Sequence, residues 1–378
     1  MKLIVAGDFC PRERVATCIE NDDYEAVVGE VKSVTNDIDY AIVNLECPVV
    51  EHGAMPIDKC GPNLRCSRKA IEALKWAGFD CVTLANNHFF DFGETGVKDT
   101  LEACRANETD YVGGGQNIKE AGRILYKEIN GQKLAIVNCC EHEFSIATED
   151  AGGSNPLNIV KQYYAIQEAR HNADHVLIII HGGVELFWLP SKRMIETFRF
   201  FIDSGADAVV NHHQHCYSGY EVYKGKPIFY GLGNFCFDGK PDDYRWTSGY
   251  MVSLRFGESQ EVNFDIIPYR QCADSPNVRI IHDKEKEDFF EKLNDYNAII
   301  ANNEQREEAY NKWCGQNEGM YKVVLNPVNN RYIAWLFESK IGKKIISKRK
   351  LLQIFDYLVN ESHIERVRML FNREINKR

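Results

Sequence analysis

The feature that most constrains this chain is a recurring pattern in which a short, apolar, β-branched run is followed by a residue able to bind a metal. Runs of this kind are typical of buried strands in an α/β sheet. Ligands bind at the carboxyl ends of strands in such sheets. Oxygen and imidazole donors gathered there are what a hydrolytic metal site requires. The residues in question are Asp8, Glu46, Asn87, His88, His181, His213 and His215.

Length and charge narrow the classes of protein to consider. The 378 residues suffice for one large domain with an appendage, or for two domains. Hydrophobic residues make up 44% and charged residues 26%, which is ordinary for a soluble globular protein. The formal net charge of −10 argues against non-specific nucleic-acid binding, so we expect no nucleic-acid partner.

The sequence predicts a cytoplasmic protein without a transmembrane segment. No run approaches the ~18 apolar residues that span a bilayer. The apolar stretch after Lys2 is too short for a secretory signal and is interrupted by Asp8. The thirteen cysteines are scattered, without a CxxC pair or disulfide-like spacing. We interpret them as mostly small buried residues in a reducing compartment.

Residues 1–270 alternate short apolar runs with helical stretches, which predicts an α/β domain. The chain contains hairpin signals as well as parallel crossovers. Asn130-Gly131 separates two β-type runs, 123–129 and 133–139, and is a strong type I′ hairpin signal. We therefore expect a mixed sheet or a pair of sheets.

Residues 271–378 differ in composition from the preceding part and are predicted to form a helical C-terminal extension. The segment is charged and helix-prone, and a stripe of apolar residues runs from Leu351 to Leu358. The extension would either pack against the body or present a cap or partner surface. The basic run Lys340–Lys350 is interpreted as a solvated helix end.

The His213-Gln214-His215 segment adds a second indication of a metal centre. Residues two apart in an extended segment point the same way, so both imidazoles can address neighbouring metals. A carboxylate between two cations can bridge them. Two-metal sites hold their ions roughly 3.5–4 Å apart and clamp a displaced phosphoryl oxygen.

Several blocks, in this order and spacing, resemble the CapA family of bacterial capsule (poly-γ-glutamate) synthesis proteins. That family resembles the calcineurin-like metallophosphoesterases. The resemblance implies a four-layer α/β/β/α sandwich over residues 1–270. The blocks are Gly7-Asp8, Asn44-Leu-Glu46, Leu84-Ala-Asn-Asn-His88-Phe-Phe-Asp91-Phe-Gly93, His181-Gly-Gly-Val-Glu185, Gly205-Ala-Asp207, His213-Gln-His215 and Tyr230-Gly-Leu-Gly-Asn234-Phe-Cys-Phe-Asp238.

The resemblance also implies roles for individual residues. One or two divalent ions of Mn, Fe or Zn are expected, and His88 would act as general acid or stabilise the transition state. The implied ligands are Asp8 and His215 for the first metal, Asn87, His181 and His213 for the second, and Glu46 between them.

Two positions depart from the superfamily pattern. Cys10 stands where an imidazole ligand is usual, so the first metal loses that ligand unless Cys10 binds as a thiolate. Glu46 is one methylene longer than the usual bridging aspartate. A mononuclear site, or a loosely bound second metal, therefore stays open.

Four further residues in these blocks have two interpretations each. Asp91 would orient the His88 imidazole, or cap a helix beginning near residue 93. Glu185 would be a general base or an anchor for a substrate amine, or a plain surface carboxylate. Asn234 and Asp238 would line a substrate-binding rim, or form a turn.

These features predict an enzyme, a metal-dependent hydrolase of the CapA type, acting on a phosphoester. One alternative is a metal-dependent γ-glutamyl amide hydrolase or transferase. The other is a non-catalytic capsule-assembly component whose C-terminal helices bind a partner. The expected substrate is a phosphoester, or a γ-glutamyl polymer or polysaccharide. The absence of an anchor favours a cytoplasmic substrate or precursor.

Overall fold

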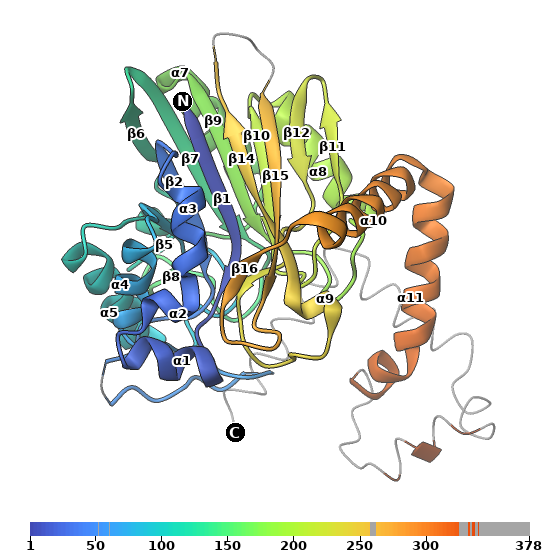
Figure 1. Cartoon of the computed structure of the whole chain (residues 1–378), viewed down its shortest axis with the longest axis horizontal. Helices are drawn as coiled ribbons and strands as arrows, with labels where there is room; N and C mark the ends of the chain where they lie inside the picture. Colours follow the sequence, from blue (N-terminus) through green and yellow to red (C-terminus); the bar gives the residue numbers. More distant parts are fainter. Residues whose placement is uncertain are drawn as a thin grey trace. The chain divides into compact units, whose positions relative to one another are not determined.

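The computed structural model describes residues 1–324 except 52, 60 and 258–261, together with Tyr332, Trp335, Leu336 and Ser339. The chain divides into two compact units, Met1–Glu308 and Ala309–Arg378. Figure 1 shows the chain coloured along its sequence. Across the described part of the chain, no helix has both the length and the apolar character needed to cross a membrane.

The first unit contains two large sheets, and the first of them carries the N-terminal strand. Its order is β16-β15-β14-β1-β2-β3-β4, and β13 also pairs with β1. The segment β1 to β4 is parallel, whereas β14, β15 and β16 are antiparallel. The bounds are β1 Lys2–Phe9, β2 Tyr40–Leu45, β3 Cys81–Thr83, β4 Asp110–Val112, β13 Asn234–Cys236, β14 Ser248–Arg255, β15 Asn263–Gln271 and β16 Val278–Ile280.

The second sheet has the order β11-β12-β10-β9-β7-β6. The hairpin between β6 and β7 is the one that Asn130-Gly131 predicted, and both residues have positive φ (51° and 77°), as a type I′ turn requires. A small pair, β5 Gly114–Gly115 and β8 Gly153–Ser154, stands apart. The bounds of the second sheet are β6 Leu125–Ile129, β7 Gln132–Cys140, β9 His175–His181, β10 Ala208–His212, β11 Tyr220–Tyr223 and β12 Lys226–Phe229.

The two sheets pack face to face, because alternate strand residues point into a shared core. On β1, Leu3 and Val5 join this inner core, while Ile4 belongs to a separate outer one. On β9, Leu177 and Ile179 face inward in the same way. This alternation fixes which side of each strand meets the partner sheet.

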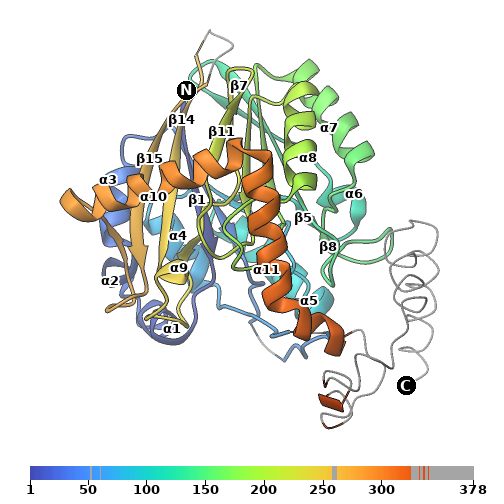
Figure 2. The same ribbon diagram turned by 90° about the vertical axis from the view of Figure 1, so that its right-hand side faces the viewer.

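Helices cover both outer faces. In Figure 2, α7 and α8 lie on one side of the sheets, and α2 and α3 on the other. The outer core of the first sheet takes its apolar side chains from α1, α2, α4 and α5. The predicted four-layer α/β/β/α sandwich is thus confirmed. The helices are α1 Glu13–Glu20, α2 Tyr24–Val28, η1 Gly29–Val31, α3 Lys32–Thr35, α4 Lys69–Trp76, α5 Gly93–Ala106, α6 Ile118–Ala121, α7 Ile159–Asn172, α8 Lys192–Asp203 and α9 Tyr244–Thr247.

Two long helices follow the sheets, as predicted for the C-terminal part. They are α10 Asp283–Ala301 and α11 Asn303–Val324. Helix α10 buries Phe289 and Leu293 in the core between the sheets. The predicted boundary after residue 270 falls inside β15, whereas the compact units divide after Glu308. The apolar stripe Leu351–Leu358 and the basic run Lys340–Lys350 lie outside the described residues.

Candidate metal centre

The predicted ligands come together where strands of both sheets end. Asp8 lies in β1, one residue before its end, opposite Asn44 of β2 and Asn234 of β13. His181 is the last residue of β9 and pairs with His212, the last residue of β10. The carboxyl ends of parallel strands share one edge, so the two sheets bring carboxylates and imidazoles to the same place.

Two trios of potential ligands share one carboxylate. Asp8, Glu46 and His215 form the first, and Glu46, His181 and His213 form the second; the donor atoms of each trio lie within 4.8 Å of one another. All five side chains are buried. A glutamate common to both trios is what a bridged two-metal site needs.

The first trio is oriented by hydrogen bonds from neighbouring groups. The Asn44 amide donates to Asp8 Oδ1 (2.7 Å), and the His213 backbone N–H donates to Asp8 Oδ2 (3.1 Å). His215 Nδ1–H donates to Asn234 Oδ1 (2.9 Å). That bond fixes the tautomer, so His215 Nε2 presents its lone pair, 3.5 Å from Glu46 Oε1.

The second trio gains a fourth donor from Asn87. His181 Nε2 lies 3.0 Å from Asn87 Oδ1, 3.1 Å from His213 Nδ1 and 3.6 Å from Glu46 Oε1. Metal–ligand bonds of 2.0–2.2 Å place neighbouring donors about 3.0–3.6 Å apart. The separations of these donor atoms therefore suit a single divalent cation.

The carboxylate of Glu46 gives the sharpest test of whether a cation fits. Its side chain is completely buried, and neither oxygen has a hydrogen-bond partner among the described residues. Burial, followed by the charge of Asp8, raises the pKa of Glu46 well above its usual range. An isolated buried carboxylate is costly unless a cation or donor compensates it. The donor set therefore fits a divalent metal at this position.

The imidazoles are suited to metal binding because they stay neutral. Burial lowers the pKa of His181 well below its usual value, and the adjacent imidazole of His213 lowers it further. Burial and His215 lower the pKa of His213 to about 3. Neutral imidazole is the form that ligates metals. The backbones of His213 and His215 have positive φ (91° and 55°), a strained geometry that clusters at functional sites.

His88 lies next to this centre in an arrangement that includes a buried lysine. His88 Nδ1 is 2.7 Å from Asp91 Oδ2, which also accepts a 2.6 Å bond from the Leu64 N–H. Lys59 forms an ion pair with the other Asp91 oxygen and lies 3.1 Å from His88 Nδ1. The Lys59 side chain is only 3% exposed. Burial lowers the pKa of His88, against the opposing effect of Asp91.

The remaining predicted residues have varied surroundings. Asn234 is buried, and its amide nitrogen lies 3.3 Å from the His215 carbonyl. Asp238 accepts a two-pronged bond from Arg14 (2.8 and 2.9 Å). Glu185 is exposed, and its charge acts on Glu46. The structure thus gives Asn234 and Asp238 protein partners, and their contacts with substrate stay predictions.

Cys10 is buried at the end of β1 and belongs to neither trio. Its thiol is among the groups that raise the pKa of Cys47, after burial, the largest cause. The thiolate ligation of Cys10 stays a prediction.

Sequence reasoning assigned no role to three residues of the site. Asn44 bonds Asp8 and lies 3.3 Å from His181 Nδ1. Glu143 accepts from the Asn87 amide (3.3 Å), and Lys59 pairs with Asp91. Asn44 lies within an otherwise apolar strand, and this polar residue was a signal from which its role could have been predicted. Lys59 and Glu143 lie in loops, where only the fold brings them to the site.

Comparison with known proteins places this chain among capsule-synthesis proteins. Residues 2–239 match the family described as "Bacterial capsule synthesis protein PGA_cap". The chain is 31% identical over 287 residues to "Capsule biosynthesis protein CapA" of Bacillus anthracis, covering 73% of this chain and 69% of that protein. It is 31% identical over 236 residues to "PGA biosynthesis protein CapA" of Bacillus subtilis (strain 168), covering 61% and 62%.

Among solved structures, the chain is similar to a "novel phosphatase" from Mycoplasma pneumoniae. The sequence identity is 18% and the TM-score 0.47, with 77% of this chain and 98% of that chain covered.

Proposed function

Because the chain belongs to the family of bacterial capsule synthesis proteins, we propose that it is a metal-dependent hydrolase that acts on a phosphoester in capsule or poly-γ-glutamate biosynthesis. The observation that carries this proposal is the buried, unpartnered Glu46 carboxylate, shared by two ligand trios. A protein without a bound cation would gain nothing from such a group, since burying it costs free energy.

Two ions, or one with a weaker second, would be held by the predicted ligands. When bound, a divalent metal would supply Lewis-acid polarisation of a phosphoryl oxygen and would lower the pKa of a water. The site's own residues prepare it for this role. Asn234 fixes the tautomer of His215, and Asn44 fixes the orientation of Asp8.

His88 is the group we propose to hold and deliver the leaving-group proton. Asp91 accepts from His88 Nδ1, which leaves Nε2 as the ring atom available to a substrate. Lys59 neutralises Asp91. The carboxylate orients the ring and supports the imidazolium, the form in which Nε2 carries a proton, while Lys59 limits that support, so the proton on Nε2 stays transferable. Glu185, on the exposed rim, is proposed as a base or as an anchor for a substrate amine.

A second candidate is hydrolysis or transfer at a γ-glutamyl amide by the same metal centre. The observation that favours it is the name of the relative in Bacillus subtilis, "PGA biosynthesis protein CapA". The chain spans 62% of that relative's length, so this activity is proposed and not carried over from it. A polarised carbonyl oxygen would take the place of the phosphoryl oxygen.

Activity measurements on the full chain separate these candidates. The protein, loaded with Mn²⁺, Fe²⁺ or Zn²⁺, would be assayed against phosphomonoesters, phosphodiesters and γ-glutamyl amides, with EDTA as control. The proposal predicts phosphoester turnover that is lost in EDTA and reduced about 10²–10⁴-fold in His88→Gln, the usual contribution of a general acid. Lys98→Ala, at an exposed helix position, is the matched control. Turnover of the amide alone would replace the first candidate with the second.

A further inference from the structure

A cleft of about 350 Å³ lies beside the metal centre. The loop after β1 and the start of α1 form one wall, and the segment from β13 into α9 forms the other. Its lining residues are Arg12, Glu13, Arg14, Asp238, Gly239, Lys240, Pro241 and Trp246.

Trp246 is shared by the cleft and the metal centre. Its ring lies 5.1 Å from the His215 imidazole and packs edge-on against Phe237 at 5.0 Å. Phe237 in turn packs edge-on against His215 at 5.3 Å. The Trp246 indole N–H donates to the Phe237 carbonyl (2.6 Å), which fixes the ring. A group bound in the cleft would therefore lie one side chain away from a metal ligand.

The charges that line the cleft leave a positive excess. Arg14 and Asp238 neutralise each other through their two-pronged bond. Among the described residues, Arg12 forms an ion pair only with its sequence neighbour Glu13, at 3.3 Å and on an exposed surface, where screening makes such pairs weak. Lys240 is exposed, and within the described part of the chain it forms no ion pair; its ammonium lies 4.5 Å from the Trp246 ring centroid.

Both cations lie close to aromatic rings. The Arg12 guanidinium lies 6.0 Å from the Phe237 ring centroid, next to the Lys240–Trp246 contact. By contrast, Glu143 lies on the Asn87 side of the centre. An anionic substrate group is therefore favoured on the His215 side and disfavoured near Glu143.

We propose that this cleft is a subsite for an oxyanion of the substrate, a carboxylate or phosphate other than the group attacked at the metal centre. Lys240 and Arg12 bind the oxyanion, and Trp246 forms the wall against which the adjoining part of the substrate packs. The proposal rests on the hydrolase function above and extends it. It assigns a substrate with at least two anionic groups.

Binding measurements on the full chain test the subsite apart from catalysis. Inorganic phosphate and, separately, glutarate would be titrated by calorimetry, first in EDTA and then with Mn²⁺. In EDTA, we expect Arg12→Ala/Lys240→Ala to bind one or both anions about tenfold more weakly than the wild type, the effect of losing a charge-assisted contact. The tighter anion identifies the group that the cleft prefers. Neither side chain is buried, so the double variant retains the core.

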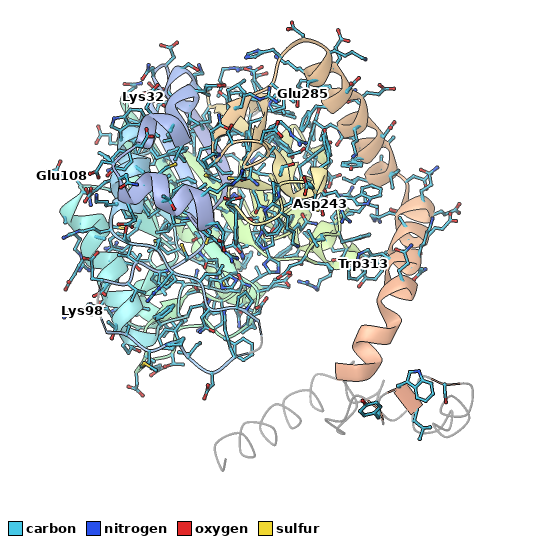
Figure 3. The ribbon with its side chains drawn as sticks, turned by 60° about the horizontal axis from the view of Figure 1, so that its bottom comes forward. Lys32, Lys98, Glu108, Asp243, Glu285 and Trp313 are labelled. Carbon is cyan, nitrogen blue, oxygen red and sulfur yellow. The ribbon has the colours of Figure 1, made fainter. Side chains whose placement is uncertain are left out.

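Lys98→Ala is the matched control, because Lys98 lies on α5, far from the loop that carries Asp243 and borders the cleft (Figure 3). It should bind both anions like the wild type. Equal binding by the wild type and the double variant in EDTA, or no binding of either anion, would overturn the subsite.

A kinetic comparison then separates the subsite from the hydrolase function. For a phosphoester with a distal carboxylate, the double variant should raise KM about tenfold and keep kcat, while an ester without that carboxylate is unaffected. The same KM in the double variant and the wild type for the ester with the distal carboxylate would also contradict the subsite. No turnover of any ester by the metal-loaded wild type would contradict the hydrolase function alone, since the titration in EDTA still decides the subsite.

Discussion

Replacing Glu46 with glutamine should stabilise the metal-free protein while removing its response to metal. An ionised carboxylate that is buried without partners costs several kcal/mol, whereas an unpaired neutral amide costs about 1–3 kcal/mol. Both Glu46 oxygens lack partners among the described residues, and Asp8 adds a like charge. We therefore expect Glu46→Gln to raise the free energy of unfolding in EDTA by about 2 kcal/mol.

The pH dependence of this gain has a definite sign. The folded-state pKa of Glu46 is raised above its unfolded value, so the native state binds the extra proton. Stability from this group is thus present at low pH and is lost as pH rises from the unfolded pKa through the folded one. The advantage of Glu46→Gln over the wild type should grow with pH. The buried histidines contribute to both proteins and cancel in the difference.

Thermal unfolding in EDTA and in Mn²⁺, over a pH series, measures both effects. About 2 kcal/mol corresponds to a rise of roughly 2–3 °C in Tm for a chain of this size. Asp91→Asn is the contrasting control, because it leaves Lys59 unpaired and should destabilise the protein with or without metal. The reasoning is refuted if Glu46→Gln is less stable than the wild type in EDTA, or if Mn²⁺ stabilises both equally.

Substitutions at three other residues probe the surroundings of the centre. At about a hundredfold excess over its Kd, Mn²⁺ should stabilise the wild type by about 2.7 kcal/mol in thermal unfolding. The His213→Ala variant should lose most of this stabilisation. If the variant keeps all of it, His213 is not a ligand. Lys59→Met should lower the free energy of unfolding, measured in urea, by about 3 kcal/mol, because it leaves the buried Asp91 carboxylate with less compensation. Lys59→Arg should lower it less. Equal stability of Lys59→Met and the wild type would show that the ion pair is dispensable. Asn234→Ala should weaken metal binding about 10–100-fold by calorimetry, since it releases the ring of His215; unchanged affinity would deny that role.

Strand identity, and with it the clustering of the candidate ligands, was largely predictable because these residues accompany recognisable buried runs. The strand that carries Asp8 continues through Phe9, so this ligand lies within a strand, whereas the sequence pattern placed it in the loop beyond. The hairpin at Asn130-Gly131 followed from turn chemistry alone. These signals are local, which is why the sequence contains them.

The contacts between elements could not be predicted in the same way. Lys59 reaches Asp91 from a loop with no periodic pattern, and Arg14 reaches Asp238 across most of the chain. Helix α1, Glu13–Glu20, is only 8 residues long and buries Val15 and Ile19, so its apolar stripe is too short to identify a helix from sequence. Contacts between residues far apart in the sequence depend on the packed fold, so no short stretch of the sequence predicts them.

Metal content tests the central claim most directly. The full-length protein would be purified without chelator, reconstituted with Mn²⁺, Fe²⁺ or Zn²⁺, and analysed for bound metal beside Glu46→Gln and Lys98→Ala. The shared glutamate predicts about one to two equivalents in the wild type and in Lys98→Ala, and a clear loss in Glu46→Gln. A wild type that binds no metal after reconstitution, or a Glu46→Gln protein that binds as much as the wild type, would contradict the metal centre proposed for this fold.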